Sequence, residues 1–297
     1  MTDDARVDRI EADVAVVRSS YDREPFGFSH TLHHNDIFCF DEIRALAERH
    51  TADDYFVATS ASTPATRFYD VGHGMLTPSA AIDNIENSGY RIILKRPERY
   101  DRRFGHLLET LFSEVRSLRS WPIDERVVRL DGAILISSSA AITPLHFDPE
   151  VSFFFQIAGN KTYHLLNSET MTEEELEAFY VRGKLDIGQV AYDRHRDARE
   201  YLFELSPGMG MHQPQNTPHW VQTHNSPTIS YVFSIETNHS RARGRTRGFN
   251  HIQRQLGLPP ATPGARPHLD EWKSGSMRAA FGLRDAFRPV VRALRKR

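Results

Sequence analysis

The chain has 297 residues, 39% of them hydrophobic and 26% charged, with a formal net charge of -2 at pH 7. This composition is ordinary for a soluble globular protein, and the lack of an overall positive field predicts no nucleic-acid partner. A single cysteine, Cys39, excludes an internal disulfide. No run approaches the roughly 18 consecutive apolar residues of a membrane span, and the charged N-terminus lacks the apolar core of a signal peptide. We therefore expect a cytoplasmic protein.

Residues 1–90 are predicted to form a helical and loop segment that packs on the rest of the chain. Apolar residues recur at helical spacing from Val7 to Val17, which indicates one amphipathic helix. A second, short helix is expected after Asp41, with this aspartate as its cap. Residues 51–90 are rich in Ser, Thr, Asp, Asn and Gly and are predicted mostly as loop.

A strand and a helix are predicted next, over 91–95 (RIILK) and 102–119. From residue 126 the sequence changes to short runs rich in β-branched and aromatic residues, which favour strands. These runs are VVRLDGAILISSS, VSFFFQI, KTYHLL and TISYVFSIET, and Ala-Gly-Asn at 158–160 separates two of them as a hairpin turn. A mainly β sandwich or barrel is therefore predicted over 91–237, followed by a linker and a helical tail over 238–297.

The segment Thr-Pro-Leu-His-Phe-Asp at 143–148 carries the first candidate metal ligands. Alternate side chains of a strand share a face, so His146 and Asp148 project together while Phe147 points away. A His-x-Asp pair by itself is more often structural than functional. Its weight here depends on two further segments.

The second segment, PQNTPHWV at 214–221, places His219 just before another predicted strand. Asn216 occupies a position where a tight turn needs a positive φ, which Asn tolerates better than most residues. Two histidines and one carboxylate, on strands distant in sequence, are typical of the facial triad of non-haem iron(II) oxygenases. His212 and His224 flank His219, and we interpret both as solvated loop histidines.

The third segment begins with Lys161, which opens an otherwise apolar and aromatic strand. Burying an ammonium group without an anion is costly. An isolated lysine here would be interpreted as solvent-facing, but beside a His-x-Asp pair it predicts an anion, the distal carboxylate of 2-oxoglutarate. Thr143 could add a hydroxyl donor to that carboxylate, although Pro144 implies an irregular strand, so alternation does not decide which way Thr143 points.

Together these segments resemble the cupin-like branch of the jumonji-C oxygenases. The family pattern is Thr-Pro-x-His-x-Asp, then Gln-Ile-x-Gly-x-Lys, then Pro-x-x-x-x-His before a closing strand. This chain has all three, from Thr143 to Asp148, from Gln156 to Lys161 and from Pro214 to His219. The resemblance extends over roughly residues 90–237 and is strongest to the asparaginyl hydroxylase that inhibits hypoxia-inducible factor.

The resemblance implies a double-stranded β-helix of the cupin or jelly-roll type with N-terminal and C-terminal helices. It implies Fe(II) bound by His146, Asp148 and His219, with 2-oxoglutarate held by Lys161 and Thr143. The expected activity is that of a dioxygenase, a hydroxylase that consumes dioxygen and oxidises a small-molecule or peptide substrate. Family members also often dimerise through C-terminal helices, which predicts a homodimer.

Two departures and two alternatives accompany this prediction. Family members often have Asn where this chain has Ser152 and Ser234. The first alternative is a non-redox cupin enzyme of the sugar isomerase or epimerase type, which usually has more histidines and needs no lysine at this interval. The second is a binding module that has lost catalysis, against which the intact triad argues.

Overall fold

The computed structural model describes residues 8–59, 62–69, 76–86, 89–183, 186–195 and 198–294. Contacts divide the chain into two compact units. The ranges that contribute to unit 1 are Met1–Asp124, Arg129–Thr170 and Ile187–Ile235, and those of unit 2 are Glu125–Val128, Met171–Asp186 and Glu236–Arg297. The three-part division of the chain at residues 90 and 237 stays a prediction.

In the described residues, unit 1 is built around two antiparallel sheets, of eight and five strands. The large sheet, in spatial order, consists of Ile10–Glu11 (β1), Phe26–His30 (β2), Met209–Gln213 (β11), Val151–Ala158 (β7), Thr228–Thr237 (β13), Val127–Ser137 (β5), Tyr90–Lys95 (β4) and Tyr55–Thr59 (β3). The small sheet consists of Glu200–Leu205 (β10), Lys161–Leu166 (β8), His219–Thr223 (β12), Ile142–Phe147 (β6) and Gly188–Gln189 (β9). This mainly β jelly roll with helices at both ends of the chain confirms the predicted cupin-type fold.

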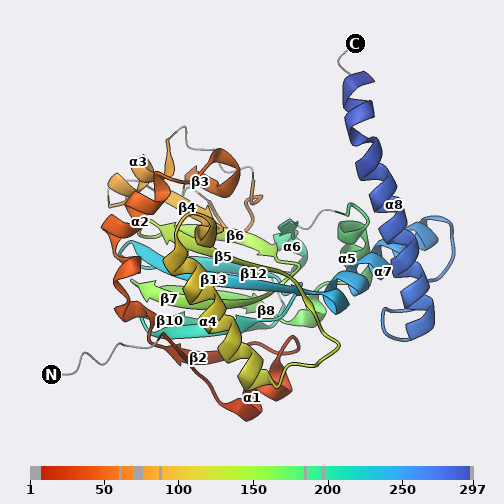
Figure 1. Cartoon of the computed structure of the whole chain (residues 1–297), viewed down its shortest axis with the longest axis horizontal. Helices are drawn as coiled ribbons and strands as arrows, with labels where there is room; N and C mark the ends of the chain where they lie inside the picture. The colour runs from red at the N-terminus through yellow and green to blue at the C-terminus, as the bar shows by residue number, and fades with distance from the viewer. Residues whose placement is uncertain are drawn as a thin grey trace. The chain divides into compact units, whose positions relative to one another are not determined.

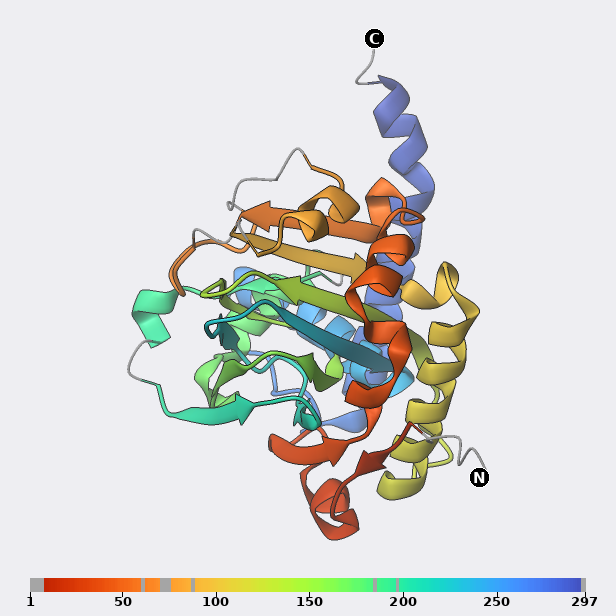
Figure 2. The ribbon, with the colours of Figure 1, turned by 90° about the vertical axis from the view of Figure 1, so that its left-hand side faces the viewer.

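The helices of unit 1 are Val14–Ser20 (α1), Phe40–Ala47 (α2), Pro78–Asp83 (α3), Arg102–Arg119 (α4) and Tyr192–His195 (α6), with 3-10 turns at Leu32–His34, Asp36–Phe38, Ala52–Asp54, Pro97–Arg99 and Ser168–Thr170. Figures 1 and 2 show α2 and α4 lying against the outer face of the large sheet. The small sheet lies on the opposite, inner side. The strand over 91–95 and the helix over 102–119 are confirmed.

Strand β7 explains why the sequence contains three consecutive phenylalanines. Phe153 and Phe155 contact aromatic rings on the helix-covered side of the large sheet, including Phe233. Phe154 points the other way, into a core cluster with Tyr163 and residues of β10, β11 and β12. A strand buried on both faces is apolar without alternation. The inside of the barrel is therefore identified by the neighbours of Phe154.

The turn at 158–160 is present and requires glycine, but the predicted hairpin is wrong, because β7 lies in the large sheet and β8 lies in the small sheet. Gly159 has φ +67°, and a Cβ there would lie 2.5 Å from the carbonyl oxygen of Pro227. Only glycine adopts this conformation freely. The turn therefore carries the chain from β7 in the large sheet to β8 in the small sheet, whose first residue is Lys161.

Two local predictions for the N-terminal region are wrong. Ile10–Glu11 is a strand that pairs with β2, not part of a helix. Helix α1 begins only at Val14, because the side chain of Asp13 accepts hydrogen bonds from the backbone N–H groups of Ala15 and Val16 as an N-cap. Val7 lies outside the described residues. Asp41 lies in the first turn of α2, whose N-cap is Cys39.

Residues 51–90, predicted mostly as loop, contain the strand β3 and the helix α3. The strand forms because the apolar run YFVAT pairs in register with β4. The helix forms where Thr77 caps and Pro78 opens its first turn. Tertiary pairing and capping thus override the polar composition of this region.

Unit 2 contains the helices Glu173–Tyr180 (α5), Asn238–Gln255 (α7) and Pro267–Leu294 (α8). The arginine-rich segment 238–247 is part of α7, and its arginines are largely paired. Arg241 pairs with Glu236 and Arg247 with Glu173. Among the described residues, no helix has the length and hydropathy to cross a membrane.

Candidate metal centre

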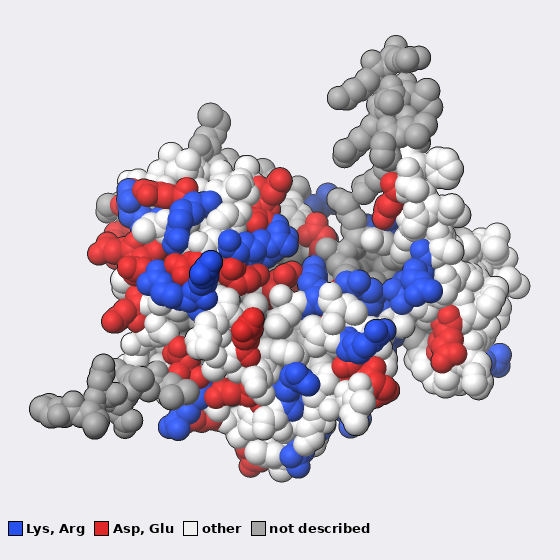
Figure 3. Space-filling view, viewed as in Figure 1, with Lys and Arg blue, Asp and Glu red and all other residues white. Residues whose placement is uncertain are grey.

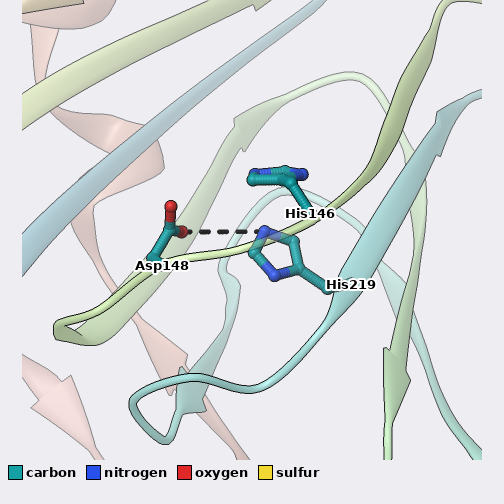
Figure 4. Close-up of side chains that lie close together, drawn as sticks. All are labelled: His146, Asp148 and His219. Carbon is teal, nitrogen blue, oxygen red and sulfur yellow. Dashed lines mark ion pairs between the residues drawn. The ribbon is translucent and has the colours of Figure 1, made fainter. Parts of the chain in front are cut away.

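His146 and His219 lie opposite each other on neighbouring strands. β6 and β12 pair antiparallel with His146 directly across from His219, and the centroids of the two rings are 4.1 Å apart. Cross-strand partners project from the same face. The rings therefore converge although the residues are distant in sequence, as Figure 4 shows.

Asp148 completes the group just after the end of β6. Its Oδ2 lies 3.7 Å from Nε2 of His219, and one ligand atom from each of the three residues lies within 4.8 Å of the others. Its backbone oxygen accepts a 2.7 Å hydrogen bond from the N–H of Asn216, which has the predicted positive φ of 59°. The turn that holds His219 is thus tied to the backbone of Asp148.

Both histidines are oriented by a carbonyl two residues earlier in the chain. Nδ1 of His146 lies 2.8 Å from the oxygen of Pro144, and Nδ1 of His219 lies 3.1 Å from the oxygen of Thr217. A ring that donates its Nδ1–H to a carbonyl presents a lone pair at Nε2, which is the tautomer that a metal ligand needs. These contacts therefore prepare both Nε2 atoms to bind a divalent cation.

The electrostatics of the site favour neutral imidazoles. Burial lowers the pKa of His146 well below 6.5, and the neighbouring His219 lowers it further. Burial also lowers the pKa of His219, an effect that the Asp148 carboxylate opposes. A neutral ring can bind a metal without first losing a proton. Two neutral donors and one half-buried carboxylate suit a divalent ion, and three protein ligands leave coordination positions for other molecules.

Two aromatic residues and a glutamine support the histidines, and none of them was identified from the sequence. The ring of Phe68 packs 4.7 Å from that of His146, and the ring of Tyr163 stacks at 5.2 Å on His219. The hydroxyl of Tyr163 donates to Oε1 of Gln213 at 2.8 Å. Such packing restricts the imidazole orientations. Strand alternation in KTYHLL is the signal that could have identified Tyr163, because residues 161 and 163 share a face of the strand.

Lys161 is buried inside the same barrel, with an exposed fraction of only 3%. It begins β8, opposite Thr223 of β12, and its Nζ lies 5.7 Å from the ring centre of Phe154. Burial lowers the pKa of its ammonium group to about 7, with a further contribution from Arg91. No ion pair or side-chain hydrogen bond of Lys161 is found among the described residues. A buried ammonium group without an anionic partner is energetically costly.

Thr143 is half-buried and is paired with Val221. Val221 belongs to the core cluster inside the barrel, so the pairing places Thr143 on the inner face as well. The register between His219 and Val221 shifts by a bulge, which allows residues three apart, Thr143 and His146, to share a face. The irregularity expected from Pro144 is therefore present.

Ser152 and Ser234, which stand where the family often has Asn, face each other across β7 and β13. Their hydroxyl oxygens lie 2.9 Å apart, and each therefore has the other as a hydrogen-bond partner. A serine pair is shorter than a pair of asparagines. The substitution thus removes amide groups without leaving these hydroxyls unsatisfied.

Arg91 is a further charged residue that the sequence interpretation missed, because RIILK was considered only as a strand. Its exposed fraction is 4%, and its guanidinium lies 5.3 Å above the ring of Phe68. Its Nε and Nη2 have no hydrogen-bond partner among the described residues. The signal was the same as for Lys161, a long cation at the start of an apolar strand.

The fold and these residues define a cupin-type barrel with a candidate His-Asp-His metal centre. The fold matches the X-ray structure of E. coli ycfD with a TM-score of 0.54, over 92% of this chain and 68% of that chain, at 16% sequence identity. It matches the structure of YcfD, a ribosomal oxygenase from Escherichia coli in complex with cobalt and succinic acid, with a TM-score of 0.50, over 93% and 68%, at 15% identity. The sequence matches no protein-family model and no curated protein.

Proposed function

We propose that the protein is an Fe(II)- and 2-oxoglutarate-dependent dioxygenase of the jumonji-C type, which hydroxylates a small-molecule or peptide substrate. The observation that carries the proposal is the presence of two unlike features in one barrel. One is a His-Asp-His group with both Nε2 atoms prepared for a metal. The other is the buried ammonium of Lys161. A metal site alone would suit many cupins, whereas a metal site with a buried cation suits a co-substrate that is both chelating and anionic.

In this proposal His146, Asp148 and His219 hold Fe(II), while Lys161 binds the distal carboxylate of 2-oxoglutarate with Thr143 as a second donor. Iron and 2-oxoglutarate together supply the oxidising power for hydroxylation by dioxygen, with succinate and carbon dioxide as co-products. The protein residues orient both groups and exclude water from them. The particular likeness to the asparaginyl hydroxylase stays a prediction.

The structure of YcfD with cobalt and succinic acid supports the proposal at the level of a shared fold, since that protein is a ribosomal oxygenase. On the face drawn in Figure 3, acidic and basic side chains are interspersed.

An anaerobic titration tests the proposal. Fe(II) and 2-oxoglutarate are added separately and together to the full chain, and the visible absorption spectrum is recorded. A charge-transfer band that needs both components supports the oxygenase. Metal binding without such a band would indicate the non-redox cupin, and no metal binding at all would indicate the binding module.

Matched histidine variants make the titration specific. His146→Ala should lose the band. His224→Ala should keep it, because His224 lies on the outer side of the small sheet, where its Nε2 contacts the hydroxyl of Thr162 at 2.7 Å. Equal loss in both variants would point to a general effect on folding.

The homodimer is a separate proposal. Helix α8 exposes Trp272, Leu283 and Phe287, each with an exposed fraction of 60% or more. Large apolar side chains gathered on a helix often mark an interface. Light scattering coupled to size exclusion should give twice the 34.0 kDa chain mass, and Leu283→Glu with Phe287→Glu should restore the mass of one chain.

A further inference from the structure

The register of the large sheet places Arg91 on the inner face of the barrel. Arg91 pairs with Ala58 of β3 and with Ser137 of β5, and two residues further along β4, Ile93 pairs with Leu135. Leu135 packs against the core cluster of the barrel interior. Side chains two apart on a strand share a face. Arg91 therefore points into the interior to which Lys161 contributes from the opposite sheet.

Arg91 is within electrostatic reach of both ends of the proposed co-substrate site. Its charge contributes to lowering the pKa of Lys161 and that of His146. Phe68 connects it to the metal ligands, since one ring contacts both the guanidinium and the imidazole of His146. An elongated dicarboxylate with its oxo-acid end at the metal and its distal end at Lys161 would pass beside this guanidinium.

Among the described residues, no carboxylate forms an ion pair with Arg91. Burial is the sole cause that lowers its pKa, to about 10, so it remains protonated at neutral pH. Two of its nitrogens are buried without a hydrogen-bond partner among the described residues. Unsatisfied buried donors of a charged group are strongly unfavourable, and a guanidinium presents its donors in a fork that matches a carboxylate.

We propose that Arg91 and Lys161 form a two-cation site, one from each sheet, which binds the distal carboxylate of a dicarboxylic 2-oxo acid and selects it against monocarboxylic 2-oxo acids. This inference rests on the proposed function and adds a specificity-determining residue to it. Arg91 is the group that distinguishes this site from one with a single lysine. Two buried positive charges without an anion destabilise the ligand-free site. A dicarboxylate that neutralises them should therefore bind tightly.

The test compares two 2-oxo acids of equal chain length, 2-oxoglutarate and 2-oxovalerate, which lacks the distal carboxylate. Their dissociation constants are measured by calorimetry on the full chain loaded with Mn(II). Arg91→Met should raise the constant for 2-oxoglutarate at least about tenfold, the loss of one hydrogen bond to a charged group, and should change that for 2-oxovalerate less than about threefold. Arg91→Lys should recover part of the loss.

Arg247→Met serves as the matched control, because Arg247 is also a buried arginine but pairs with Glu173 in unit 2. It should leave both constants unchanged. Equal weakening of both acids by Arg91→Met, or no weakening of 2-oxoglutarate, would overturn this inference while Mn(II) and 2-oxoglutarate still bind the wild type. If the wild-type protein failed to bind Mn(II) or failed to bind 2-oxoglutarate, the proposed function itself would be overturned.

Discussion

Buried cations are treated in opposite ways in the two units. In unit 2, Lys273 is 1% exposed and donates to Oδ1 of Asn250 at 2.6 Å, and Arg247 is 8% exposed and makes two hydrogen bonds to Glu173. Inside the barrel of unit 1, Lys161 and Arg91 are buried to the same degree, and the described residues supply neither with a carboxylate.

The difference separates a structural role from a binding role. The partner of a buried charge offsets much of the desolvation cost of that charge, whereas a buried charge without a partner lowers stability. Such a cost persists where a ligand supplies the missing partner. We therefore propose a binding role for the barrel cations, whereas the cations of unit 2 are paired within its helix packing.

The largest effect should come from the metal ligands, on which any anion site in the barrel depends. Asp148→Ala removes the only carboxylate of the His-Asp-His group, so metal binding and substrate-coupled succinate release should fall to background. Succinate release is measured with the chain's substrate or, before one is identified, as uncoupled turnover of 2-oxoglutarate. Normal release by this variant would refute the ligand assignment.

The next effect should come from the lysine of the site. Lys161→Met should weaken 2-oxoglutarate binding by about 10- to 100-fold, the loss of one charge-assisted hydrogen bond, and leave the Mn(II) affinity unchanged. Calorimetry with each ligand in turn measures both. A parallel fall in Mn(II) affinity would mean that Lys161 acts on the metal centre as a whole.

Two lysine variants, one in each unit, test the difference between paired and unpaired buried cations through the free energy of unfolding. Lys273→Met leaves Oδ1 of the fully buried Asn250 without its donor, so the free energy of unfolding should fall by about 1–3 kcal/mol. Lys161→Met leaves no partner behind and should leave that free energy unchanged or raise it by up to about 2 kcal/mol. Guanidinium denaturation followed by circular dichroism measures both. Equal destabilisation would remove the distinction between the two kinds of cation.

The smallest effect should be a pH dependence of co-substrate binding. Lys161 has a pKa lowered from 10.5 to about 7 in the ligand-free protein, and the carboxylate binds its protonated form. Affinity should therefore be full below pH 7 and fall by up to about tenfold per unit above it. Burial lowers the pKa of His146 and His219 away from this window. Calorimetry between pH 6 and 9 should give a slope in the wild type and none in Lys161→Met.

The sequence was sufficient for the features that depend on spacing. Alternation placed His146 and Asp148 together, and the turn chemistry around Asn216 indicated where His219 lies. The runs of aromatic and β-branched residues predicted a sandwich or barrel, because such residues favour strands and several short strands pack into these folds.

Features that depend on pairing could not be predicted in this way. Arg91 became visible only once the register with β3 and β5 placed it on the inner face. The strand at Ile10–Glu11 exists because β2 is available to pair with it. The arginines of 238–247 are largely paired because acids elsewhere in the sequence meet them in unit 2. Each is a long-range contact that local pattern does not encode.

A crystal structure of the full chain grown with Mn(II) and 2-oxoglutarate tests the central claim most directly. We predict an anomalous peak within bonding distance of Nε2 of His146, Nε2 of His219 and the carboxylate of Asp148, with the distal carboxylate of the co-substrate against Nζ of Lys161 and the guanidinium of Arg91. A metal bound elsewhere, or a co-substrate that leaves both barrel cations without an anion, would contradict it.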